Sequence, residues 1–299
     1  MPPVIRWALF LAVIGLGTGW ALTRPTHITY AEVAGLTGDA EAGEAVFWAA
    51  GCASCHAGED AEAEARLVLA GGQAFPSDFG TFRAPNISPD PTHGIGGWTL
   101  AQFLTALQNG ISPEGQHYYP AFPYTAYRLA ERQDLADLFA FMQTLPASDT
   151  PSLPHDVGFP FSIRRAVGLW NVLNLRDDYV ITTELTEEEA RGRYLSEALA
   201  HCGECHTPRN AIGALDRARW MQGAPNPSGR GTIPALTPDV LTWSQDEIAA
   251  YLNDGFTPDF DTAGGHMRSV IENLALLPAQ DRDAIAAYLQ ALPAADVAP

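Results

Sequence analysis

The chain has 299 residues, enough for about two domains of ordinary size, and 46% of them are hydrophobic, which is sufficient for a buried core. Its 17 basic residues, all of them Arg, stand against 35 acidic ones, so the net charge is −18. A polyanion without a basic stretch argues against nucleic acid and anionic lipid as partners. Such a body would instead attract a basic protein surface.

The first predicted element is an apolar helix at the N-terminus. Residues 7–22 carry no charge, and with their neighbours they are long enough to cross about 30 Å of hydrocarbon. Trp7 and Trp20 stand where interfacial aromatic residues belong. We expect residues 1–24 to be an uncleaved membrane anchor with the body of the chain outside the cytoplasm. The alternative is a signal peptide that is removed by cleavage. Residues 19–21 are its best cleavage site, and they match the pattern of two small residues poorly because the aromatic Trp20 stands between them.

All four cysteines lie in two copies of the pattern C-x-x-C-H. The residues are Cys52, Cys55 and His56 in the first copy and Cys202, Cys205 and His206 in the second. This pattern is the attachment signature of c-type haem, in which two thioethers hold the porphyrin and the His binds iron. Zinc would need a closed set of four ligands, and a redox-active Cys pair would need no trailing His. The sequence predicts two covalent haems, with a buried disulfide pair as the remaining alternative.

The two motifs belong to an internal repeat. Equivalent residues recur at offsets of 145 to 150. The pairs include Cys52 with Cys202, residues 86–90 with 235–239, Trp98 with Trp243, Gly110 with Gly255, and residues 145–146 with 292–293. A tandem duplication is therefore expected, with one copy over residues 39–147 and the other over 186–295. Residues 25–38 and 148–185 are the predicted linkers.

Each copy is predicted to contain three helices joined by long loops, so the expected fold class is all-α. The predicted helices cover residues 40–49, 99–108 and 129–145 in the first copy and 186–199, 244–253 and 278–292 in the second. Capping residues open several of these helices, and Gly110 and Gly255 end two of them. Residues 163–175 form a further predicted helix. We expect it to pack across the junction between the copies rather than to contact the membrane, because Arg164, Arg165 and Asn171 interrupt its apolar run.

Each copy resembles a class I cytochrome c domain. The whole chain is similar to membrane-anchored dihaem cytochromes c and to the cytochrome subunits of periplasmic alcohol, aldehyde and gluconate dehydrogenases. The resemblance covers about residues 39–295 and rests on the two motifs and on residues 86–90, 94–98 and 110–124. Those subunits usually carry three haem domains, whereas this chain has two motifs. The resemblance implies two cytochrome c domains held at the periplasmic face of a bacterial inner membrane.

The resemblance also implies an iron ligand opposite each motif His. Class I cytochromes supply a Met from a loop before the last helix, and Met267 has that position in the second copy, next to His266 as a competing donor. The equivalent residue of the first copy is Phe122, which cannot bind iron. Three possibilities stay open there: ligation by His117, which we favour, ligation by His93, or an open iron face.

Five further residues are candidates for contacts with the haem propionates and the haem pocket. They are Arg83, Asn86, Trp98, Arg209 and Trp243. The expected function is electron transfer in a respiratory chain, between redox partners such as a dehydrogenase, another cytochrome or a terminal oxidase. No catalytic residue is predicted. The alternatives are a peroxidase-like or thiosulfate-oxidising haem enzyme with an open first haem, and a permanent electron-transfer subunit of a periplasmic dehydrogenase.

Overall fold

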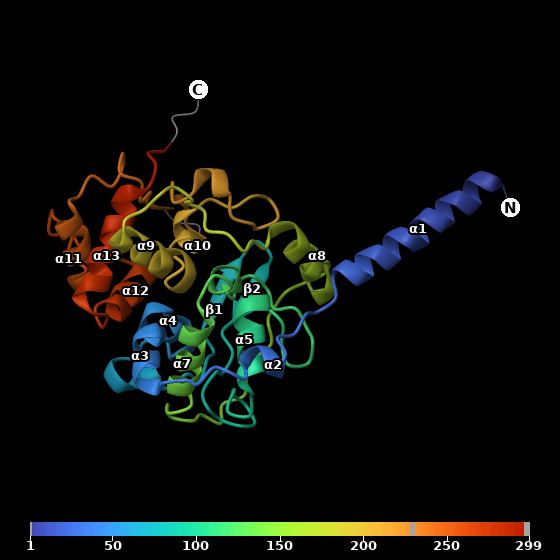
Figure 1. The fold of residues 1–299 in the computed structure, drawn as a ribbon, viewed down its shortest axis with the longest axis horizontal. Helices are drawn as coiled ribbons and strands as arrows, with labels where there is room; N and C mark the ends of the chain where they lie inside the picture. The colour runs from blue at the N-terminus through green and yellow to red at the C-terminus, as the bar shows by residue number, and fades with distance from the viewer. Residues whose placement is uncertain (1, 228–230, 296–299) are drawn as a thin grey trace.

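Two groups of helices lie side by side, and one long helix projects from them (Figure 1). The computed structural model describes residues 2–227 and 231–295. The N-terminal part contains α1 (Pro3–Leu22), α2 (Tyr30–Val33), α3 (Ala40–Ala49), α4 (Cys52–His56), η1 (Ala63–Leu67), β1 (Ala74–Ser77), β2 (Gly80–Arg83), α5 (Leu100–Asn109), α6 (Tyr124–Tyr127), α7 (Arg132–Met142) and α8 (Arg164–Asn174). The C-terminal part contains α9 (Glu187–Arg193), η2 (Tyr194–Leu199), α10 (Gly203–His206), η3 (Arg217–Arg219), β3 (Ala224–Pro225), β4 (Thr232–Ile233), α11 (Gln245–Asp254), α12 (His266–Leu274) and α13 (Ala279–Ala291).

The ends of the helices follow from local hydrogen bonding. Thr99, Thr186 and Ser244 each form a reciprocal capping box with the third residue of the helix they open. Gly110 and Gly255 end α5 and α11 in the left-handed conformation, with φ of 62° and 78°, which glycine adopts without strain. The predicted helical class is confirmed, and the seven helices predicted after residue 39 begin and end within three residues of their expected positions. Where a loop is predicted around Met267, the structure has the further helix α12.

The loops after the two motifs are not entirely irregular. Each contains a short antiparallel hairpin, β1 with β2 and β3 with β4, that the sequence analysis did not predict. The strands are two to four residues long and rich in Gly and Pro, so they carry too little alternation of apolar and polar residues to be recognised.

The same close helix crossing occurs in both groups. A Cβ atom on Gly43 of α3 would lie 2.0 Å from the carbonyl oxygen of Asp137 in α7. A Cβ atom on Gly192 of α9 would lie 1.8 Å from the carbonyl oxygen of Ala284 in α13. These contacts are with main-chain atoms, which cannot rotate away. Both crossings therefore require glycine, and they hold the helix before each motif against the closing helix.

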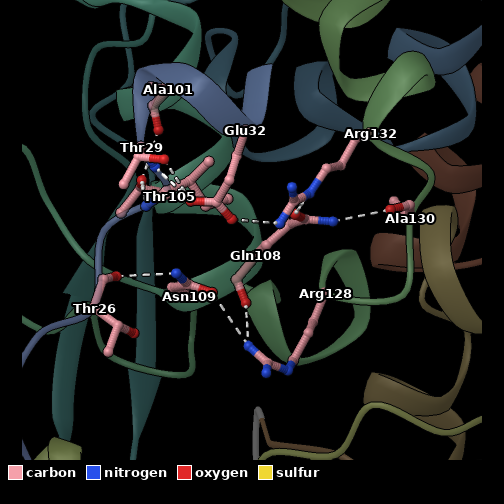
Figure 2. Close-up of polar contacts among 11 residues, drawn as sticks. Thr26, Thr29, Glu32, Ala101, Thr105, Gln108, Asn109, Arg128, Ala130 and Arg132 are labelled. Carbon is pink, nitrogen blue, oxygen red and sulfur yellow. Dashed lines mark hydrogen bonds and ion pairs between the residues drawn. The ribbon is translucent and has the colours of Figure 1, made fainter. Parts of the chain in front are cut away.

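The predicted linker over residues 25–38 lies along the first helix group as a strap (Figure 2). The backbone N–H of Ile28 donates to Oγ1 of Thr105 over 2.9 Å, and Nδ2 of Asn109 donates to the carbonyl of Thr26 over 2.9 Å. Arg132 lies 3.5 Å from the carboxylate of Glu32. These contacts hold the end of α1 close to the body of the protein.

The predicted second linker contains α8, which contacts both helix groups and the end of α1. Oη of Tyr124 donates to Oδ1 of Asn171 over 2.7 Å, and the indole N–H of Trp170 donates to the carbonyl of Ile212 over 2.8 Å. Arg165 donates to Oγ1 of Thr23 over 2.9 Å. The helix thus joins the two groups, as the sequence predicted, and also reaches the end of α1.

We predict that Gly43→Ala and Gly192→Ala each reduce the free energy of unfolding by about 1–3 kcal/mol, the usual cost of overpacking a tight contact. Thermal unfolding followed by circular dichroism measures this loss. Gly35→Ala is the matched control, because a Cβ atom there has no neighbour within 4 Å. Equal stability of all three variants would contradict the role given to the crossings.

Candidate haem sites

The histidine of each motif is held in a fixed orientation by a proline carbonyl. Nδ1 of His56 lies 2.8 Å from the carbonyl oxygen of Pro85, and Nδ1 of His206 lies 2.8 Å from that of Pro234. A carbonyl only accepts hydrogen bonds, so Nδ1 carries the proton and Nε2 keeps its lone pair for a metal. Burial also lowers the pKa of both rings, which keeps them neutral. Both residues fit the proximal ligand of a haem iron.

The cysteines of the motifs form no disulfide with one another. Burial raises the pKa of Cys52 and of Cys202 to about 12. A redox-active pair requires the opposite shift, because the thiolate is the reactive form. Among the described residues, no three His, Cys, Asp or Glu side chains are gathered to hold a metal ion, so a zinc site is not supported. The thiols fit thioether attachment of a porphyrin.

The backbone around the two motifs is the same in both halves. The N–H of Gly71 donates to the carbonyl of His56, and the N–H of Gly223 donates to that of His206, both over 2.8 Å. In the first half the N–H of Ile87 donates to the carbonyl of Leu69, and at the equivalent place in the second half the N–H of Leu236 donates to the carbonyl of Met221. Met221 is fully buried and takes the place of Leu69. Its role is therefore to fill the core.

The segments that the sequence assigned to the opposite side of each haem also match. The N–H of Tyr118 donates to the carbonyl of Gly110 over 2.7 Å, and that of Ala263 donates to Gly255 over 2.9 Å. Bridges between residues 111 and 117 and between residues 256 and 262 repeat at the same offset. This register makes Phe122 the counterpart of Met267, and both side chains pack partly buried against the core.

His117 faces the end of α1. Its Nε2 lies 3.0 Å from the carbonyl oxygen of Thr23, and its Nδ1 is buried with no hydrogen-bond partner among the described residues. A Cβ atom on Gly168 in α8 would lie only 2.7 Å from the same Nε2, so the ring is closely enclosed. Because the carbonyl of Thr23 only accepts a hydrogen bond, Nε2 carries the proton and the lone pair of the neutral ring lies on Nδ1. Ligation of the first haem by His117 stays a prediction.

The other two histidines considered as ligands are exposed. The backbone N–H of His93 donates to a carboxylate oxygen of Asp90 over 2.6 Å, in the loop before α5. The ring of His266 lies 6.1 Å from that of Phe75 in β1. Ligation of iron by Met267, His93 or His266 stays a prediction.

Asn86, which is expected in the haem pocket, forms hydrogen bonds to other parts of the protein with both polar atoms of its side chain. Its Nδ2 donates to the carbonyls of Ser148 and Thr150, both over 2.8 Å, and its Oδ1 accepts from the N–H of Ser88 over 2.9 Å. These bonds fasten the start of the segment between the two halves. A contact of Asn86 with haem stays a prediction.

The remaining predicted pocket residues have different surroundings. Arg209 pairs with the carboxylate of Glu204, inside the second motif. Arg83 lies in β2, and its backbone N–H donates to His155. Trp98 and Trp243 are partly buried against the hydrophobic core. Contacts of Arg83 and the two tryptophans with haem stay predictions.

The sequence analysis missed the contacts between the two motifs. Nδ2 of Asn273 in α12 donates to Oγ of Ser54, inside the first motif, over 2.7 Å. Oγ1 of Thr125 in α6 donates to Oε1 of Glu204, inside the second motif, over 2.6 Å. Each motif helix thus docks on the segment that lies opposite the motif of the other half. The two sites share one interface.

The chain around the second motif is shaped by this interface. His201 precedes the motif with a φ of 44°, a conformation uncommon outside glycine, and the equivalent residue of the first half is Gly51, with a φ of 66°. The ring of His201 lies 5.6 Å from that of Tyr127, whose hydroxyl donates to the carbonyl of Ala50 over 2.7 Å. Contact with the other half offsets the backbone strain of His201.

The fold and the paired motifs define a c-type cytochrome. The family model described as Cytochrome c matches residues 40–146. The "Diheme cytochrome c-type" of Cereibacter sphaeroides is 56% identical over 286 residues, which cover 96% of this chain and 97% of that protein. The chain therefore belongs to the cytochrome c family, among its dihaem members, and it carries two covalently bound c-type haems.

More distant relatives are subunits of dehydrogenases. The "Fructose dehydrogenase cytochrome subunit" of Gluconobacter japonicus is 38% identical over 82% of this chain and 51% of that protein. The "Gluconate 2-dehydrogenase cytochrome c subunit" of Pantoea cypripedii is 32% identical over 85% of this chain and 59% of that protein. The chain thus spans only somewhat more than half the length of these two subunits.

Replacing both cysteines of one motif should remove one haem. We predict that Cys52→Ala with Cys55→Ala halves the haem content per chain in a pyridine haemochrome assay, and that the same change at Cys202 and Cys205 does likewise. Glu59→Ala is the control, because it changes an exposed residue just after the first motif without removing a thioether. Unchanged haem content in either double variant would contradict the assignment.

Proposed function

We propose that this protein relays electrons between redox partners at the outer face of a bacterial inner membrane. In this proposal residues 39–147 and 186–295 are tandem class I cytochrome c domains with one haem each. The observation that carries it is the interface shared by the two motifs, at which Ser54 contacts Asn273 and Glu204 contacts Thr125.

The interface supports a relay because electron transfer slows steeply with distance. The contacts involve residues within both C-x-x-C-H motifs, so they fix the attachment points of both haems relative to each other. A rigid, close pair needs no rearrangement when an electron passes between its members. No nucleophile or proton donor is required for this function.

The N-terminal helix supports the proposed location. It is apolar over Pro3–Leu22, none of its residues is buried, and it is the single described helix long and apolar enough to span a membrane. The signal-peptide alternative would remove it. The attachment of covalent haem outside the cytoplasm supports a periplasmic position for the body. The names of the relatives favour a dehydrogenase as electron donor, either transiently or as a permanent partner.

We further propose that the two haems differ in coordination. Met267 would bind the iron of haem 2 together with His206, whereas Phe122 offers the iron of haem 1 no donor atom and the ring of His117 is enclosed between Thr23 and Gly168. Ligation by Met and His raises the reduction potential, so haem 2 is the acceptor end of the relay. An open iron face would also admit a small exogenous ligand. Binding of such a ligand therefore tests the alternative that the protein is a haem enzyme.

Electron paramagnetic resonance of the oxidised protein tests this asymmetry. We predict one high-spin and one low-spin signal, and binding of carbon monoxide to one of the two reduced haems. Phe122→Met should make haem 1 low-spin and abolish carbon monoxide binding, whereas Met267→Ala should create a second open haem. His117→Gln, which keeps a donor for Thr23, should leave both signals unchanged. Two low-spin signals in the unaltered protein would refute the open site.

The acidic body predicts the salt dependence of the relay. Stopped-flow mixing of the oxidised protein with a reduced, basic single-haem cytochrome should reduce both haems, at a rate that falls as ionic strength rises. A neutral redox dye of similar potential is the control, and its rate should not depend on salt. Reduction of only one haem would contradict the relay, and a rate independent of salt would contradict docking through the acidic surface.

A further inference from the structure

The exposed face of α8 is apolar, the reverse of the usual pattern for a surface helix. Leu169, Val172 and Leu173 are 51%, 47% and 55% exposed, whereas the polar Asn171 is buried. Exposed aromatic and aliphatic side chains also lie in the loop that precedes α8. The α8 patch, as we call it, consists of Phe159, Phe161, Ile163, Leu169, Val172 and Leu173. Exposed apolar clusters of this kind mark contact surfaces.

The patch is fixed to the outer end of the proposed anchor. Figure 1 shows α8 at the base of α1, running across its axis. Arg165 donates to Oγ1 of Thr23 and to the carbonyl of Trp20, over 2.9 and 2.5 Å. His117 holds the carbonyl of Thr23 from the other side. The last turn of α1 and the first turn of α8 therefore form one rigid junction.

This junction determines the depth of the patch. If α1 spans the bilayer, Trp20 lies at the outer interface, where tryptophan side chains gather. The guanidinium groups of Arg24 and Arg165 lie 4.6 and 5.4 Å from its ring, as cation–π contacts that suit the same zone. A helix bonded to Trp20 and running across α1 lies at the level of the lipid headgroups.

Charge at the patch favours lipid over a protein partner. Its six side chains are uncharged, and the two arginines beside it are already engaged: Arg165 with α1, and Arg164 with the carbonyl of His117 and the ring of Tyr119. The patch itself therefore offers a protein surface no charged side chain. The net charge of −18 opposes approach to anionic lipid. Apolar insertion into a zwitterionic surface needs no such attraction.

We propose that the α8 patch inserts into the outer interface of the bilayer beside α1. The inference rests on the proposed anchoring by α1. Interfacial helices bury their apolar face about 5–10 Å into the boundary between headgroups and acyl chains. A second contact beside α1 stops the body from turning about the anchor. The haem pair is thereby presented to its partners in one orientation.

Photo-crosslinking from lipid tests this contact with the intact haem protein. The full chain is placed in nanodiscs of phosphatidylcholine that carries a diazirine near the acyl carbonyl, and adducts are mapped by mass spectrometry. We expect adducts on α1 and on the α8 patch. Val240 and Leu276, which are 56% and 53% exposed on the C-terminal half, should carry none. Adducts on α8 would reject the expectation that this helix has no contact with the membrane.

Paired variants separate this proposal from the anchor. Leu169→Gln with Leu173→Gln should lose the adducts on α8 and keep those on α1, with two haems per chain showing that the fold is intact. Val240→Gln is the matched control. Adducts on α1 alone in the unaltered protein would overturn the patch contact and leave the anchor standing, and adducts on neither would overturn both. Crosslinks from α8 to a second copy of the chain would also overturn the proposed contact between the α8 patch and lipid.

Discussion

The cross-docking of the two haem motifs is the constraint on which the structure depends. Ser54 and Glu204, at equivalent places in the two C-x-x-C-H helices, each bond to a distal segment of the other half. Arg66 adds a bond to the carbonyl of Glu272 over 3.4 Å. Isologous contacts of this kind are typical of a symmetric dimer, and here a duplicated chain makes them within itself. Neither half can turn without moving both haem attachment points.

A second junction connects this pair to the proposed anchor. The strap after α1 bonds to α5, and α8 bonds to the last turn of α1 while it contacts both halves. His117 belongs to this junction through its bond to Thr23. The exposed apolar side chains of α1 and those of the α8 patch thus lie on two helices that this junction joins.

Sequence patterns predicted the parts of the protein that are local in the chain. Capping boxes, glycine stops and the C-x-x-C-H spacing located the helices and the motifs. The repeat made Phe122 the equivalent of Met267, and the backbone register supports that match. Relations between distant residues were not accessible. Neither the bond of His117 to Thr23 nor that of Asn86 to the interdomain segment has a local signature. The cross-contacts of Ser54 and Glu204 depend on how two similar halves pack, which a repeat alone does not determine.

The central claim is that two unequal haems act as one relay. A redox titration followed by electron paramagnetic resonance, which resolves the two irons separately, tests it most directly. The account predicts two one-electron steps within the range of respiratory carriers, with the low-spin haem of the second half reduced at the higher potential. It would be contradicted if either haem stayed oxidised throughout that range, or if the haem of the first half were reduced at the higher potential.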